Sequence, residues 1–307
     1  MDLQFDQLRA FVAVIDQGSF EAAARELRIT PSAVSQRIKA LETGVGRILV
    51  QRQKPASATE SGEAVLRLAR QLALLENDTI ATLDASGARE ATSIPIVINA
   101  DSLAVWALPA LAEVFASHGV SFTVYREDQD HSTELLRRGT VMAAITSVST
   151  PVQGCLVRPL GRMRYRPMAT PEFVKRWFPD GATAESLAAA PVVLFDRKDE
   201  LQDSYLRSRG SALNPPRSYI PASAEYARAV ELGLGWGMLP GAQSEQQESA
   251  GTLVAFDPDG SIDVPLYWQQ WKLHSPLLAA VADAVSRAAA RHLGQCHLTE
   301  RQGHTLR

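Results

Sequence analysis

Cysteine is scarce in this chain, and that scarcity excludes two kinds of site. The only cysteines among the 307 residues are Cys155 and Cys296, and neither belongs to a CxxC motif or to a group of cysteines and histidines. Structural zinc sites and disulfide frameworks each need several such residues at short spacing. The sequence therefore predicts no structural metal and no disulfide framework, and we expect no cofactor.

Long hydrophobic runs are missing as well. The first 14 residues, MDLQFDQLRAFVAV, lack the basic region, continuous apolar core and small-residue cleavage site of a signal peptide. No apolar run approaches the roughly 20 residues that cross a bilayer. We therefore expect a chain of ordinary globular composition that stays in a reducing cytoplasm and does not bind a membrane.

Motifs of common enzyme classes are also absent. There is no GxSxG, P-loop or GxGxxG motif, since LGLGWG at 232–237 lacks the spacing and follows an expected helix instead of opening one. Cys155 has no motif around it, and His118, His131 and His274 occur in unrelated contexts. Because a nucleophile needs a base within hydrogen-bond reach, we expect no catalytic residues and no enzymatic activity. A two-lobed α/β enzyme is the alternative of a different class.

The overall charge is small but unevenly distributed. The net charge is −3, whereas the segment 20–60 holds seven basic and four acidic residues, a local net charge of +3. Phosphate binding depends on the local basic surface and not on the total. This segment could therefore bind nucleic acid, although many solvated surfaces share its composition.

Three short helices are predicted near the start of the chain. Apolar residues in 6–17 recur on one helical face, Gly18 can end that helix, and Ser19 can cap the next one. Thr30 and Pro31 stand in the order preferred at a helix N-cap and first position. Three tightly joined helices of this kind are typical of a helix-turn-helix unit.

The third helix has an unusual polar face. In TPSAVSQRIKALE, residues 30–42, the uncharged Ser32, Ser35 and Gln36 precede any charged residue. In a helix-turn-helix unit, residues at this place reach base edges in the major groove, where Gln can pair with adenine and Ala33 can contact a thymine methyl. The alternative is that these side chains simply face water.

A wing is predicted after the third helix. Residues 44–59 suggest a strand, a basic turn and a second strand, with Arg52 and Lys54 placed to contact phosphate or the minor groove. An exposed hairpin with ordinary solubilising charges is the alternative. The full set of predicted DNA-binding residues is Ser19, Thr30, Pro31, Ser32, Ala33, Ser35, Gln36, Arg37, Lys39, Arg52 and Lys54.

A long helix is predicted to begin at Thr59. Along it, residues recur at alternating spacings of three and four: Val65, Leu68, Leu72, Leu75, Thr79 and Thr82. This spacing indicates a coiled-coil seam, through which a homodimer would present two DNA-reading units to a palindromic operator. The alternative is that the stripe packs on its own domain. Residues 84–90 have the composition of a linker.

From residue 94 onward, strands and helices alternate, with Pro109 expected to kink the first of these helices. The predicted strands are 94–100, 121–128, 141–146, 191–195, 218–222, 235–240 and 264–272, and 275–293 is a closing helix. Alternation of this kind implies a parallel sheet covered by helices. Two similar sets suggest two lobes with a ligand cleft between them.

The predicted domains follow from these patterns. They are a winged helix-turn-helix domain at 1–58, a linker and dimerisation helix at 59–90, and an effector domain at 91–307. Within the last, lobe I covers about 91–163 and 268–307, and lobe II about 164–267.

The quoted motifs together resemble the LysR-type transcriptional regulators. The segments at 18–42, GSFEAAARELRITPSAVSQRIKALE, and 59–66, TESGEAVL, match the winged head of that family, and the likeness covers the whole chain. It implies an α/β effector domain of two lobes, like that of periplasmic binding proteins. The segments 98–111, 125–139 and 265–272 resemble members that sense arginine and lysine and control the export of basic amino acids.

The resemblance implies an effector site between the lobes. There, the helix that follows Asn99 could bind an amino acid carboxylate through Ser102, and Thr146 and Ser223 could add hydroxyls. A cationic side chain would need carboxylates, and Asp101, Glu127, Asp128, Asp130 and Asp196 follow expected strand ends. The alternatives are that Asp101 and Asp130 only cap helices and that Glu127, Asp128 and Asp196 are surface charges.

The function expected from this resemblance is a one-component switch. Lysine or arginine would change the arrangement of the lobes and so control binding to a double-stranded DNA operator. The expected partners are the operator, the basic amino acid and a second copy of the chain, with a tetramer and RNA polymerase as further candidates. An architectural DNA-binding protein without an effector is the alternative.

Overall fold

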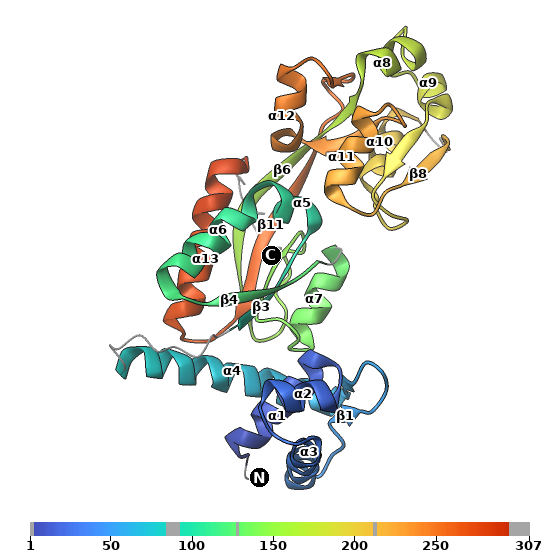
Figure 1. The fold of residues 1–307 in the computed structure, drawn as a ribbon. Helices are drawn as coiled ribbons and strands as arrows, with labels where there is room; N and C mark the ends of the chain where they lie inside the picture. The colour runs from blue at the N-terminus through green and yellow to red at the C-terminus, as the bar shows by residue number, and fades with distance from the viewer. Residues whose placement is uncertain (1–2, 84–92, 127–128, 211–213, 295–307) are drawn as a thin grey trace, which may run out of the picture. The chain divides into compact units, whose positions relative to one another are not determined.

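The structure, a computed structural model, describes residues 3–83, 93–126, 129–210 and 214–294. Its first compact unit comprises Met1–Ile98, Leu111–Val157 and Trp268–Ala284, and its second comprises Asn99–Ala110, Arg158–Tyr267 and Val285–Arg307. Figure 1 shows the course of the chain, with labels on many of its helices and strands. The second unit includes 99–110, which the sequence placed in lobe I, and the predicted domain boundaries stay a prediction.

The first three helices are the predicted ones. Helix α1 (Phe5–Gln17) ends at Gly18, whose φ of +67° is left-handed, and α2 (Phe20–Glu26) is capped by Ser19. Helix α3 (Pro31–Val45) begins with Pro31 after the cap residue Thr30. The predicted helix starts are confirmed because caps and prolines act locally, within one turn of the backbone that they satisfy.

These helices enclose a small hydrophobic core. Phe11 of α1 and Val34, Ile38 and Leu41 of α3 belong to one cluster of buried residues. Burial of each such side chain contributes about 1.5–3 kcal/mol, so the apolar stripe of α3 is fixed against α1 and its polar face is left outward. We call residues 5–58 the reading head.

The wing is present and is anchored in the same core. Strands β1 (Val50–Gln51) and β2 (Ser57–Ala58) are antiparallel, with Val50 opposite Ala58. Leu49 and Val50 are buried, whereas 51–55 at the tip are exposed. The predicted hairpin is therefore confirmed, and its basic tip faces outward.

Helix α4 (Glu60–Leu83) divides the predicted seam into two parts. Of the predicted seam, Val65 is buried in the core of the reading head and Leu72 packs against it, so the first part packs on its own domain, as the alternative interpretation held. Further along, Leu75 of the seam is exposed, as are Ile80 and Leu83, which lie outside the predicted seam. Only the second half of the helix offers free apolar side chains for a partner.

The α/β part contains one large sheet. Strand β3 (Ser93–Ile98) pairs in parallel with β4 (Ser121–Tyr125) and β5 (Ala143–Thr146). The sheet order is β10-β6-β11-β5-β3-β4, with β9 also paired to β6. The remaining strands are β6 (Cys155–Ala169), β9 (Gly237–Pro240), β10 (Val254–Ala255) and β11 (Ile262–Trp271).

Two features of this sheet differ from the sequence prediction. The 15-residue strand β6 was not predicted, and β9 pairs with it in an antiparallel manner, with Tyr165 opposite Pro240. The alternation of strands and helices predicts parallel pairing only between strands joined by a crossover helix. Strand β6 is not joined to β9 in that way, so local pattern could not reveal this pairing.

The helix after β3 is interrupted. It consists of α5 (Ala100–Ser102), a π-helical turn η1 (Leu103–Ala107) and α6 (Leu108–His118). The sequence predicted a kink at Pro109, and the irregular turn lies directly before it, since proline cannot donate the regular backbone hydrogen bond. The element Ala100–His118 is also long and apolar enough for a membrane span, contrary to expectation. Because Trp106, Ala110 and Val114 are buried in protein, it is also consistent with a core helix.

The second unit has a smaller parallel pair, β7 (Val192–Leu194) and β8 (Arg217–Tyr219). Its helices are α8 (Pro171–Trp177), α9 (Ala184–Ala189), α10 (Leu201–Arg209), α11 (Ser223–Glu231) and α12 (Gly241–Ser249). Trp236 is fully buried, and its ring lies 5.3 Å from that of Tyr205. It is therefore a packing residue.

Two more helices complete the described fold. Helix α7 (Gln129–Arg137) leads into β5, and the predicted closing helix is present as α13 (Pro276–His292). The side chain of Trp271 on β11 is buried, and its ring N–H donates to the carbonyl of Leu136 in α7 over 3.4 Å.

Candidate functional site

The polar face of α3 lies at the surface of the protein and is accessible to solvent. Ser32, Gln36 and Lys39 are exposed, and Ser35 and Ala33 are half-buried, while the apolar stripe of the same helix lies in the core. The side chains that were predicted to reach base edges are therefore accessible to a ligand as large as a duplex. Their contact with bases stays a prediction.

Three of the predicted DNA-binding residues also have a local role. The Ser19 hydroxyl accepts a hydrogen bond from the backbone N–H of Ala22, and Thr30 accepts one from Ala33, each over 3.1 Å. Pro31 occupies the first position of α3. These residues hold the starts of α2 and α3 in place, and so position the exposed side chains.

The basic residues of the reading head differ in how firmly they are held. Arg37 forms an ion pair of 3.0 Å with Asp6 of α1. The Arg52 guanidinium lies 5.1 Å from the centre of the Phe20 ring, a cation–π distance, while Lys54 is exposed at the wing tip. Arg37 and Arg52 are thus preorganised on the surface that would meet a phosphate backbone.

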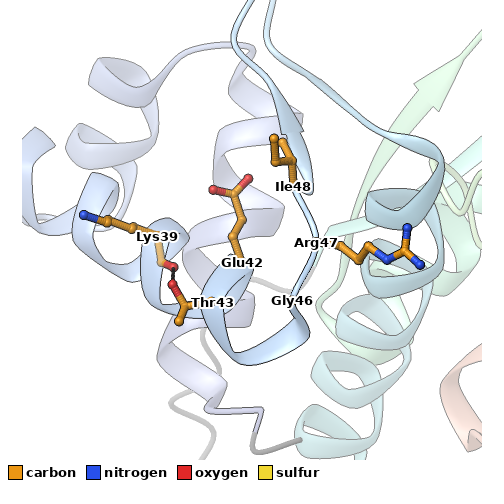
Figure 2. A pocket seen from close by; sticks show the side chains of 6 residues that line it. All are labelled: Lys39, Glu42, Thr43, Gly46, Arg47 and Ile48. Carbon is orange, nitrogen blue, oxygen red and sulfur yellow. Dashed lines mark hydrogen bonds between the residues drawn. The ribbon is translucent and has the colours of Figure 1, made fainter.

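A shallow hollow of about 280 Å³ lies beside the end of α3 (Figure 2). Glu42 in its wall is already engaged, since Oε1 accepts hydrogen bonds from the backbone N–H groups of Leu49 and Val50 at 2.9 and 3.2 Å. Lys39 and Arg47 flank the hollow and point in opposite directions. Because the Glu42 carboxylate is already hydrogen-bonded, the charged groups that remain for a ligand are Lys39 and Arg47. Two exposed cations suit contacts with phosphate groups and not a small organic ligand.

A second polar site surrounds Asp101. Its Oδ2 accepts a hydrogen bond from the Tyr165 hydroxyl of β6, and its Oδ1 accepts one from the Ser223 hydroxyl, each over 2.8 Å. Gln243 of α12 donates to the Ser223 carbonyl over 3.0 Å. We call these four residues the Asp101 cluster. Asp101 does not cap its own helix, because both carboxylate oxygens bond to distant parts of the chain.

Buried polar atoms without a partner lie on the same elements. Among the described residues, the Oδ1 of Asn99, the Oγ of Ser102 and the Oε1 of Gln243 are buried and form no hydrogen bond. An unsatisfied buried polar group lowers the stability of the folded protein by about 1–3 kcal/mol. A hydrogen bond from a ligand or a water molecule would remove that cost. Asn99 and Ser102 flank Asp101 in sequence, which supports a ligand site at the start of this helix.

The structure gives Asp196 a local role and draws attention to Asp199. Asp196 Oδ1 accepts backbone hydrogen bonds from Lys198 and Asp199 at 2.7 and 3.0 Å, and so closes its own turn. Asp199 accepts from the backbone of Phe195 and Leu201, each over 3.1 Å. Burial raises the pKa of Asp199, and the negative charge of Asp101 raises it further. The negative charges of Asp199 and Asp101 are therefore within electrostatic range of each other.

Three further predicted effector residues have no described contact with this cluster. Thr146 is buried at the end of β5 in the first unit, and its hydroxyl accepts from the backbone N–H of Val148 over 3.2 Å. Glu127 and Asp128 lie outside the described residues. Their part in effector binding stays a prediction.

Sequence reasoning missed three residues of this site: Tyr165, Asp199 and Gln243. Burial raises the pKa of the Tyr165 hydroxyl well above its usual value, so it stays a hydrogen-bond donor. One signal was available for β6, because arginines alternate with other residues at 162, 164 and 166, as on a half-buried strand. Nothing local indicates that this strand meets residue 101.

Metal binding finds no support in the described part of the chain, which contains no group of three or more metal-ligating side chains. The one described cysteine, Cys155, is buried, and burial raises the pKa of its thiol to about 11. A thiol with such a pKa is protonated at neutral pH and is a poor nucleophile.

Comparison with known families assigns both parts of the chain to one family. Residues 5–63 match the bacterial regulatory helix-turn-helix proteins of the lysR family, and residues 89–290 match the LysR substrate binding domain. The chain belongs to the LysR family. The DNA-binding head and the ligand-binding α/β domain predicted from the sequence are thereby confirmed as the two parts of a LysR-type regulator.

Two similar proteins within the LysR family are transcriptional regulators named LysG. The chain is 46% identical over 294 residues to the transcriptional regulator LysG of Mycobacterium tuberculosis, covering 94% of this chain and 95% of that protein. It is 44% identical over 289 residues to the lysine export transcriptional regulatory protein LysG of Corynebacterium glutamicum, covering 94% and 98%.

Solved structures of LysR-type regulators are similar over nearly the whole chain. ArgP from Mycobacterium tuberculosis has a TM-score of 0.82 at 45% identity, covering 96% of this chain and all of that one. Full-length LysG from Corynebacterium glutamicum with bound effector Arg has a TM-score of 0.74 at 42% identity, covering 95% and 100%.

Proposed function

We propose that this LysR-type regulator binds arginine or lysine and thereby controls its binding to an operator. The Asp101 cluster carries the proposal, because its half-buried carboxylate lies beside polar atoms of Asn99, Ser102 and Gln243 that are buried without a hydrogen-bond partner. The bound Arg in the structure of LysG from Corynebacterium glutamicum supports the choice of ligand. The name of the lysine export regulator from the same organism supports export of basic amino acids as the regulated process.

The chemistry of the site suits a ligand with a positive side chain. Asp101 and Asp199 can form charge-assisted hydrogen bonds with an ammonium or guanidinium group. The hydroxyl of Ser102 and the side-chain oxygen of Asn99 can serve the ligand's own carboxylate and ammonium groups. A neutral amino acid would leave the two half-buried carboxylates without a counter-charge, and so would lose the charge-assisted hydrogen bonds.

Oligomerisation and location complete the proposal. The exposed apolar residues Leu75, Ile80 and Leu83 on the second half of α4 would form the seam of a homodimer. Such a dimer would place two reading heads on a palindromic operator in the cytoplasm, within reach of RNA polymerase.

A thermal-shift screen of the full-length protein against the twenty amino acids tests the proposed function. A ligand at 100 times its Kd stabilises the folded protein by about 2.7 kcal/mol, so a true effector gives a clear rise in Tm. We expect L-arginine and L-lysine to raise Tm and their neutral analogues L-citrulline and L-norleucine to have little effect. An architectural DNA-binding protein would respond to none of them, and that result would refute the proposal.

A further inference from the structure

One face of α4 packs closely on the effector domain within the first unit. Glu63, Arg67 and Arg70 are spaced by four and three residues, so they share this face. Glu63 lies 3.5 Å from Arg138, just beyond α7. A Cβ atom added to Gly139 would come within 3.0 Å of the Arg67 backbone, and the φ of Gly139 is +74°. Only glycine permits this approach of helix to turn.

Arg70 is the buried centre of this contact. Its side chain is only 3% exposed, and its Nη1 donates to the carbonyls of Gly139, over 2.6 Å, and Thr140. Its Nη2 donates to the Asp16 carboxylate of α1. One guanidinium thus joins the reading head, the linker helix and the turn between α7 and β5.

The three contacts of Arg70 depend on one another. A buried guanidinium is costly unless its N–H groups are paired. Loss of one partner therefore makes burial of Arg70, and with it the remaining contacts, less favourable. The guanidinium is planar, and its Nη1 and Nη2 must reach the two carbonyls and the carboxylate at the same time. This requirement restricts the relative orientation of α1, α4 and the turn after α7. Such a contact favours one arrangement of the joined elements over intermediate ones.

The turn held by Arg70 is connected to the predicted effector residues. Thr140 lies three positions before β5, and β5 ends at the buried Thr146. Strand β5 is hydrogen-bonded in parallel to β3, which leads directly to Asn99. A ligand that moves the ends of these strands would therefore act on the turn that Arg70 holds.

We propose that Arg70 is a positioning residue that couples effector occupancy to the orientation of the reading head. Its guanidinium is fully engaged in one arrangement of the head and effector domain and is released in the other. The inference rests on the proposed function for the nature of the effector. The contact of Arg70 with Asp16, Gly139 and Thr140 does not depend on it.

Operator binding of the full-length protein tests the coupling. A duplex selected from a random pool with the wild-type protein serves as operator, and its Kd is measured with and without saturating L-arginine. Coupling of this kind changes affinity by about 5–150-fold in regulators, and we expect Arg70→Met to bring that ratio close to 1. L-arginine itself should bind with wild-type Kd within about threefold, because Arg70 does not belong to the Asp101 cluster.

Two further variants make the test specific. Arg70→Lys keeps the charge, but a single ammonium group cannot bond in two directions as the guanidinium does. The ratio of operator Kd values with and without L-arginine should therefore fall between those of the wild type and Arg70→Met. Arg138→Gln removes an arginine of the same interface that is 53% exposed, and it should keep the wild-type ratio. A wild-type ratio in Arg70→Met, or an equal loss in Arg138→Gln, would overturn the role of Arg70.

A distance measurement separates this inference from the proposed function. Spin labels are placed at the exposed Glu21 of α2 and Ala116 of α6, with both native cysteines replaced by alanine. We expect a narrow distance distribution in the wild type and a broad one in Arg70→Met, without any amino acid added. A narrow distribution in Arg70→Met overturns the inference. A broad one together with no arginine binding by the wild type refutes only the proposed effector.

Discussion

The Ser223 hydroxyl donates a hydrogen bond to Asp101 over 2.8 Å, although the two residues are 122 positions apart. Ser223 begins α11, and Asp101 lies in the first turn after β3. The second oxygen of Asp101 accepts from Tyr165. Asp101 is thus the residue at which three separate segments meet. Removal of its charge should change the affinity of any ligand bound there.

We expect Asp101→Asn to weaken the binding of L-arginine by about 10–100-fold. A hydrogen bond to a charged group contributes about 1.5–3 kcal/mol, and the amide also places an N–H group against two hydroxyl donors. Isothermal titration calorimetry measures the Kd. Asp196→Asn is the matched control, because Asp196 closes its own turn, and it should bind within about twofold of the wild type. Equal losses in both variants would contradict the assignment of the site.

Arginine affinity should fall as the pH is lowered from neutrality. Burial raises the pKa of Asp199, so this carboxyl gains its proton at a higher pH than an ordinary aspartate. A cationic ligand favours the ionised carboxylate, and its affinity is therefore fully present above the raised pKa and lost as pH falls through it. Titration calorimetry over a pH series measures this dependence.

The variant Asp199→Asn provides the control for the pH series. It should bind arginine more weakly near neutrality and show a flatter pH profile than the wild type, because the group that titrates has been removed. If the two profiles are parallel, another group is responsible and Asp199 does not contact the ligand's cation.

Gln36→Ala should relax base preference without preventing DNA binding. Gln36 is exposed on the third helix of the reading head, where one good base contact contributes about 1–3 kcal/mol of discrimination. Selection from a random duplex pool, followed by Kd measurements on single-base variants of the operator, reports the change.

Lys39→Ala is the matched comparison on the same helix. Lys39 flanks the shallow hollow and is expected to contact phosphate, so its removal should weaken all sequences alike and reduce the slope of log K against log salt by about 0.9. If Gln36→Ala also weakened every sequence equally, the base contact would be disproved.

Ile80→Glu combined with Leu83→Glu should convert the proposed dimer to a monomer. Both side chains are exposed on the second half of α4, and a pair of like charges on each copy would meet across the seam. Light scattering coupled to size-exclusion chromatography measures the mass. The control is Glu76→Gln on the same exposed stretch, which should leave the mass unchanged; a dimer that survives both charges would place the interface elsewhere.

Local signals were enough for the reading head. Gly18, Ser19, Thr30 and Pro31 each act on backbone groups within a few residues, so the sequence alone determined where the helices begin and end. The periodicity of α3 likewise assigned one face to the core and the other to solvent, because burial follows directly from helical spacing.

The Asp101 cluster and the Arg70 contact could be found only in the tertiary structure. Asp101 could equally have capped its own helix, and nothing near Tyr165 shows that β6 passes beside it. The seam on α4 also proved divided, since Val65 packs on the reading head while Leu75 is exposed. The physical reason is the same in each case. Caps and periodicities act over a few residues, whereas the partner of a buried charge is chosen by which distant segments the fold brings together.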